Sequence, residues 1–171
     1  MQFKATSKRD FPPARWVFSS LWRLLAFGLG TGLIRPGPGT WGTALAWLMW
    51  WAGLSALSTA HALVLVGVSF IFGCWLCERV GTEIGVADHS GINWDEWVAF
   101  LLVLACIPAG WGWQALGFIL FRFFDIVKPT PIGYLDRRLK GGVGVMTDDM
   151  VAALYALLGV WLVHFIIQGS I

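Results

Sequence analysis

Long apolar runs constrain the fold of this chain more than any other feature. Residues 42–58 and 61–77 are two such runs, and residues 150–167 form another. A further run, residues 97–121, is interrupted at 107–113 by the sequence IPAGWGW, which fits two short spans joined by a tight turn. Because a membrane-spanning helix needs about 20 mostly apolar residues, the pattern predicts an all-α integral membrane protein with about five transmembrane helices.

The composition supports a membrane protein. Hydrophobic residues make up 57% of the 171 residues and charged residues 13%, with a mean hydropathy of +0.70, whereas a typical soluble domain is about 25% charged. The twelve tryptophans agree, because tryptophan gathers at membrane–water interfaces. A net charge of +2 gives no reason to expect a nucleic-acid partner. We expect one domain over residues 1–171, with residues 1–20 as a cytoplasmic N-terminal extension.

The distribution of charge predicts an orientation. If the N-terminus is cytoplasmic, the outer connections are residues 58–61, residues 107–113 and the C-terminal tail, and none of them contains Lys or Arg. All twelve basic residues and all ten acidic residues then fall on the inner side. This agrees with the positive-inside rule. We therefore expect the polar chemistry of the protein on the cytoplasmic face of the membrane.

A segment rich in glycine and proline, GLGTGLIRPGPGTWGT, precedes the first apolar run. Part of it falls in residues 16–34, a stretch too polar for a span, which we expect to be an interfacial or re-entrant element. The backbone N–H groups of Gly39 and Thr40 lie just before a predicted helix and could bind an anion, and Arg35 could add a positive charge. A plain re-entrant turn explains the glycine pattern equally well.

The segment GVADHSGINWDEW places several polar side chains just before another span. Asp95 and Glu96 would stand at the start of a helix, where the helix dipole alone favours acidic residues. That effect explains either acid but not a cluster of them, and carboxylate oxygens are also the ligands that Mg²⁺ prefers. His89 fits a structural hydrogen-bonding role as well as a catalytic one.

Ionisable side chains also stand at the end of the run that follows. Arg122 and Asp125 are three residues apart, so they share one helix face. An ionisable residue inside a span indicates function by default, and a structural ion pair is the alternative for Asp125. Lys128, which follows, could hold a phosphate or attract anionic lipid headgroups.

Two adjacent aspartates, Asp148 and Asp149, precede the last apolar run. Two like charges side by side repel unless positive charge lies nearby, and a shared divalent cation would satisfy both. The sequence GGVG at residues 141–144 predicts a flexible or tightly turning loop just before them.

Four blocks in this order resemble the bacterial phosphatidylglycerophosphatase A family: GTGLIRPGPGTWGT, DHSGINWDE, FRFFDIVKPTPI and LDRRLKGGVGVMTDDMVA. The resemblance implies a Mg²⁺-dependent, multi-pass phosphatase of the bacterial inner membrane. Its substrate would be phosphatidylglycerophosphate, which loses its terminal phosphate to give phosphatidylglycerol in phospholipid biosynthesis. The histidines lie outside the motifs of histidine-based lipid phosphatases, so a phosphohistidine mechanism is not expected.

We accordingly predict that carboxylates bind one or two Mg²⁺ ions; the predicted ligands are Asp95, Glu96, Asp125, Asp148 and Asp149. The predicted catalytic residues are Asp95, Asp125, Asp149, His89 and Lys128. The predicted substrate-binding residues are Arg35, Gly39, Thr40, Arg122 and Arg137. Attack by water and an aspartyl-phosphate intermediate both remain open, and the general base is either a carboxylate or His89.

A non-enzymatic membrane protein, such as a small transporter or assembly factor, is the alternative function. Transport sites generally lie near the middle of the membrane. The acidic residues of this chain fall instead at the ends of the predicted spans, which favours an enzyme acting at the membrane surface. The sequence makes no prediction of the oligomeric state.

Overall fold

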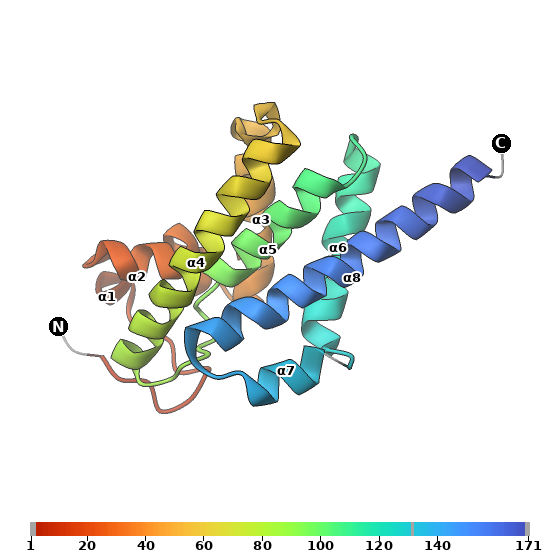
Figure 1. Cartoon of the computed structure of the whole chain (residues 1–171). Coiled ribbons are helices and arrows are strands. Elements are labelled where there is room, and N and C mark those ends of the chain that lie inside the picture. The colour runs from red at the N-terminus through yellow and green to blue at the C-terminus, as the bar shows by residue number, and fades with distance from the viewer. Residues whose placement is uncertain (1–2, 131, 170–171) are drawn as a thin grey trace.

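The computed structural model describes residues 3–130 and 132–169, and all regular structure within them is helical (Figure 1). The prediction of an all-α protein is confirmed. The helices are α1 (Ala14–Phe18), α2 (Leu21–Ala26), η1 (Gly28–Leu33), α3 (Pro38–Ala52), η2 (Leu54–Ala56), α4 (Thr59–Ile84), α5 (Trp94–Cys106), α6 (Trp111–Val127), α7 (Ile132–Arg138) and α8 (Gly141–Gly169).

The long helices α3, α4, α5, α6 and α8 run alternately up and down (Figure 1). The connections at residues 53–58 and 107–110 lie at one end of the molecule. The connection at 85–93, residues 128–130 and α7 lie at the other end, together with residues 3–13. Helix α8 packs against α4, α5, α6 and α7, and its buried residues lie between Gly142 and Val160.

Two clusters of buried apolar side chains hold these helices together. One joins α1, α2 and α4 to the start of α8 through residues such as Trp16, Phe27 and Met146. The other joins α3, α5, α6 and α8 around Phe100 and Phe121. Burying one apolar side chain of this size stabilises the folded state by about 1.5–3 kcal/mol.

Helices α4 and α8 are long and apolar enough to cross a membrane. In a soluble protein such helices would form the buried core. Here only 28% and 22% of their most apolar windows are buried, and side chains such as Ile71, Leu158 and Phe165 are exposed. Apolar surface of this extent indicates contact with lipid or with another protein.

The helix boundaries differ from the predicted runs at identifiable residues. Helix α3 begins at Pro38 because Gly37, in the left-handed conformation, turns the chain into it, and proline suits the first turn of a helix. Helix α4 continues past the apolar run and ends at Ile84. Gly85, which follows it, is also in the left-handed conformation and caps the helix. The predicted break within residues 97–121 is confirmed by the connection between α5 and α6.

The prediction of a loop at residues 141–144 is wrong for residues 142–144, which form the first turn of α8, although Gly141 has a left-handed φ of 71° where the chain turns into the helix. Glu78 of α4 accepts a hydrogen bond from the backbone N–H of Gly142 at 2.7 Å, which satisfies an otherwise unpaired group at the helix start. A Cβ at Gly142 would lie 1.8 Å from the carbonyl oxygen of Cys74. Glycine is therefore required here by the close crossing of α4 and α8, which the local sequence does not reveal.

The N-terminal region is packed onto the helices. Residues 16–34, predicted as an interfacial or re-entrant element, form most of α1 and all of α2 and η1. These three helices contact one another, and α2 also packs against α4. Before them, the backbone N–H of Ala5 donates to the carbonyl of Ile84 at 2.8 Å, and the N–H of Ser90 donates to the carbonyl of Lys8 at 3.1 Å. Residues 3–13 thus lie along the connection at 85–93.

Candidate active site

A cavity of about 230 Å³ lies among the connection at 85–93 and the facing parts of α3, α5, α6 and α8. It brings together most of the predicted site residues. Its lining consists of Gly37, Pro38, Gly39, Asp88, His89, Ser90, Ile92, Asp95, Glu96, Arg122, Asp125, Lys128, Asp148 and Asp149. Segments more than a hundred residues apart in the chain therefore meet at one polar cavity, which we call the active-site cavity.

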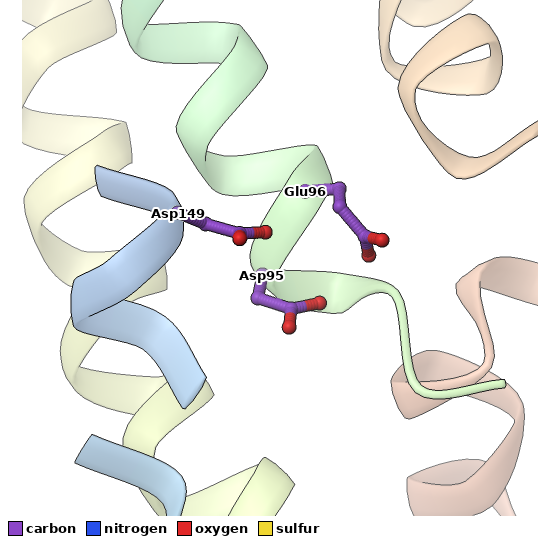
Figure 2. Close-up of side chains that lie close together, drawn as sticks. All are labelled: Asp95, Glu96 and Asp149. Carbon is purple, nitrogen blue, oxygen red and sulfur yellow. The ribbon is translucent and has the colours of Figure 1, made fainter. Parts of the chain in front are cut away.

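Three carboxylates converge in this cavity: Asp95, Glu96 and Asp149, which we call the carboxylate triad (Figure 2). Asp95 and Glu96 come from the first turn of α5, and Asp149 comes from α8. One oxygen from each lies within 4.8 Å of the others. Figure 2 shows the side chain of Asp149 reaching from α8 toward α5. This spacing allows all three residues to bind one ion.

The carboxylate triad fits a hard divalent cation. The oxygens Oδ1 of Asp95, Oε2 of Glu96 and Oδ2 of Asp149 are buried, and none accepts a hydrogen bond from the residues that the structure describes. A buried carboxylate is costly unless positive charge or hydrogen bonds compensate it. Three of them at this spacing are stabilised either by protonation or by a shared positive charge, and a set of oxygen donors is the kind that Mg²⁺ prefers.

The other two predicted metal ligands form ion pairs with basic side chains. Asp125 Oδ2 lies 2.7 Å from Arg122 Nη1, and the same nitrogen lies 3.6 Å from Oε1 of Glu96. Asp148 pairs with Lys128. The five predicted ligands therefore form two groups. Three make up the carboxylate triad, and the other two, Asp125 and Asp148, pair with the basic side chains of Arg122 and Lys128.

The backbone at Lys128 is unusual. This residue caps α6 in the left-handed conformation, with φ of 46°, although it carries a side chain. A non-glycine residue in this conformation costs roughly 1–2 kcal/mol. Such strain persists where surrounding contacts enforce it, and it is often found at functional sites. Here the turn places the Lys128 ammonium group at the cavity, against Asp148.

Gly39 brings the start of α3 against the carboxylate triad. A Cβ at this position would lie 1.9 Å from Oε1 of Glu96 and 3.0 Å from Nη1 of Arg122. The first turn of α3 therefore reaches the cavity, and anion binding by its backbone N–H groups stays a prediction. Thr40, one residue later, does not line this cavity.

One further predicted residue, Arg35, lies outside the active-site cavity. Arg35 stacks on the ring of Phe11, with its guanidinium carbon 3.9 Å from the ring centre, and it lines a neighbouring cavity. Arg137 belongs to α7, but its side chain falls outside the part of the chain that the structure describes.

Comparison of the chain with known proteins identifies its family. Residues 24–164 match the family model described as Phosphatidylglycerophosphatase A. The chain belongs to the phosphatidylglycerophosphatase A family. It is 45% identical over 143 residues to phosphatidylglycerophosphatase A of Haemophilus influenzae, covering 83% of this chain and 88% of that protein.

Two other relatives extend the comparison. Phosphatidylglycerophosphatase A of Escherichia coli is 37% identical over 147 residues, covering 85% of each chain. A protein of Bacteroides thetaiotaomicron, provisionally named a phosphatidylinositol-3-phosphatase, is 34% identical over 152 residues, covering 84% of this chain and 94% of its own. No solved structure matches this member of the phosphatidylglycerophosphatase A family.

His89 of this family member is held on both ring nitrogens. Its Nδ1 accepts a hydrogen bond from the backbone N–H of Gly91 at 3.0 Å, and its Nε2 lies 3.2 Å from the carbonyl oxygen of Asp10, to which it can donate. The side chain is fully buried. Burial lowers the pKa of the His89 imidazole below its usual value, which favours the neutral ring. The arrangement favours the structural role for His89 over the acid–base role.

This burial predicts a pH dependence of stability. Because the folded-state pKa of His89 lies below the usual 6.5, the unfolded chain binds the proton more readily. The contribution of neutral His89 is then fully present above about pH 6.5 and is lost as the pH falls toward the folded-state pKa. We expect the unfolding temperature in detergent to fall over this range, and to fall less for His89→Gln. An identical pH slope in the variant would contradict this assignment.

Asn93 is a structural residue of the site that was not among the predicted site residues. Its side-chain nitrogen donates to Thr31 Oγ1 at 3.0 Å and to the carbonyl of Pro38 at 3.1 Å. The buried Asn93 therefore fixes the glycine-rich segment and the start of α3 against the start of α5. Its position just before Asp95 and Glu96 is typical of a helix start, but these partners are visible only in the tertiary structure.

Proposed function

We propose that this chain hydrolyses the terminal phosphomonoester of phosphatidylglycerophosphate, which yields phosphatidylglycerol and phosphate in phospholipid biosynthesis. Its membership of an enzyme family, and the names of the Haemophilus influenzae and Escherichia coli relatives, support this activity. The observation that carries the proposal is the carboxylate triad, with Asp95 and Asp149 buried and Glu96 partly buried, beside Arg122 and Lys128. Acidic and basic groups in one cavity suit the binding and cleavage of a phosphate ester.

We further propose that α3, α4, α5, α6 and α8 cross the bacterial inner membrane as a single domain, with the active-site cavity at the cytoplasmic end. Helix α5 has only 13 residues, about 20 Å by helix geometry, which is less than the thickness of the hydrocarbon core. It is nevertheless packed against α3, α4, α6 and α8. Short or irregular segments are tolerated at membrane depth where protein surrounds them.

We propose Mg²⁺ as the cofactor and Asp95, Glu96 and Asp149 as the residues that hold it. Bound Mg²⁺ would supply positive charge to the phosphoryl oxygens and make a nearby water more acidic. The unpaired oxygens of the carboxylate triad support this assignment. Asp125 and Asp148 then position the side chains of Arg122 and Lys128 rather than bind the metal ion.

The remaining side chains act on the phosphate group directly. Arg122 and Lys128 would bind its oxygens and stabilise the charge that develops as the ester bond breaks. Each is held by a carboxylate, so each keeps its position when the cavity is empty of substrate. Because His89 is occupied by backbone groups, a carboxylate of the cavity is better placed to accept the proton of the attacking water. An aspartyl-phosphate route uses the same carboxylates.

The proposal is tested by phosphate release from phosphatidylglycerophosphate in mixed detergent micelles. We expect the purified protein to release phosphate with Mg²⁺, and release to fall roughly tenfold or more when a chelator removes the ion. Restoration by added Mg²⁺ separates metal loss from denaturation. A well-folded protein that releases no phosphate under any of these conditions would favour the alternative of a transporter or assembly factor.

A further inference from the structure

A second cavity, of about 450 Å³, adjoins the active-site cavity. It is lined by Arg9, Phe11, Arg35, Pro36, Gly37, Pro38 and Ser90. Gly37, Pro38 and Ser90 line both cavities, so these residues form a common wall. The two cavities are therefore immediate neighbours.

The N-terminal segment fixes Arg9 at this cavity. The carbonyl of Lys8, just before it, accepts a hydrogen bond from the N–H of Ser90 at 3.1 Å. The carbonyl of Asp10, just after it, lies 3.2 Å from Nε2 of His89. The backbone of Arg9 is thus held on both sides against the connection at 85–93, although its side chain is exposed.

Arg35 is positioned by the same segment. Its guanidinium carbon lies over the ring of Phe11, 3.9 Å from the ring centre, which is within the range of a cation–π contact. The N–H donors around the edge of a stacked guanidinium stay available for an anion, and their geometry matches two oxygens of a phosphate. Among the described residues, neither Arg9 nor Arg35 forms an ion pair with a carboxylate. The second cavity therefore presents two positive charges that no carboxylate of the described residues pairs with.

We propose that Arg9 and Arg35 bind the diester phosphate of the lipid substrate while its terminal phosphate occupies the active-site cavity. The inference rests on the proposed function and names the side chains that bind the second phosphate. A single glycerol joins the two phosphates of phosphatidylglycerophosphate, which suits two cavities that share a wall. The residues before 24, which lie outside the family match, then contribute to substrate selectivity through Arg9 and Phe11.

Product inhibition can separate the two subsites, because each product carries only one of the two phosphates. Phosphatidylglycerol retains the diester, and inorganic phosphate represents the terminal group. For Arg35→Gln and Arg9→Gln in the full chain, we expect KM and the inhibition constant of phosphatidylglycerol to rise roughly tenfold, as for a lost charged hydrogen bond. The inhibition constant of inorganic phosphate and kcat should stay within about twofold of wild type.

Arg15→Gln is the matched control, because Arg15 is an exposed arginine of α1 that lines neither cavity. We expect this variant to retain all four constants. Unchanged inhibition by phosphatidylglycerol in Arg35→Gln and Arg9→Gln would overturn the inference, as would a wild-type enzyme that phosphatidylglycerol does not inhibit. A fall in kcat with weaker inhibition by inorganic phosphate would also overturn it. Absence of any phosphate release by wild type would instead contradict the proposed function.

Discussion

Asp149→Asn is expected to lower kcat for phosphate release by roughly a thousandfold, the scale of losing a charged group that stabilises the transition state. The variant keeps the size of the side chain but removes one of three converging negative charges. We also expect Mg²⁺ to raise the unfolding temperature of wild type, since a ligand that binds only the folded state stabilises it. The same Mg²⁺ concentration should raise the unfolding temperature of Asp149→Asn much less.

Glu83→Gln is the control for this charge change. Glu83 is also a helical acid, but it pairs with Arg23 and does not line the active-site cavity. Its substitution should leave kcat and the Mg²⁺-dependent rise in unfolding temperature near their wild-type values. If Asp149→Asn retained near-normal turnover with unchanged Mg²⁺ dependence, the carboxylate triad would not be the metal site.

Gly39→Ala is expected to lower kcat by roughly a hundredfold, comparable with the cost of misplacing a reacting group by about 1 Å. The added Cβ would lie 1.9 Å from Oε1 of Glu96, so the carboxylate must leave its place in the triad. Alanine is the better helix former, and the atom it meets is the end of a flexible side chain. We therefore expect the unfolding temperature to change little while activity is lost.

Gly67→Ala provides the matched helical control. Gly67 lies inside α4, and a Cβ there would meet no atom within 4 Å. This variant should keep full activity and be at least as stable as wild type. Equal activity of Gly39→Ala and Gly67→Ala would show that Glu96 does not need its observed position.

The apolar runs and the placement of charge predicted much of the fold. Five long helices follow from runs such as 61–77 and 97–121, because an apolar segment of that length satisfies its backbone groups as a helix. Prediction failed at 141–144, where two adjacent glycines indicated a loop. From Gly142 onward the backbone is helical because Glu78, more than sixty residues earlier, caps it and because α4 crosses closely.

The sequence by itself determined which residue types meet at one end of the helices. The order of the apolar runs sends each charged segment to the same end, and acids such as Asp95 and Asp149 stand at that end whatever the details of packing. The sequence also carried the family blocks, which lie within the matched residues 24–164.

Only the tertiary structure decided which acids converge and which are paired. Asp148 and Asp149 are neighbours of the same type, yet one pairs with Lys128 and the other joins the carboxylate triad. Successive residues of a helix point about 100° apart, so their partners depend on how α8 is rotated against α5 and α6. That rotation is set by packing among helices distant in sequence, and no local pattern of residues records it.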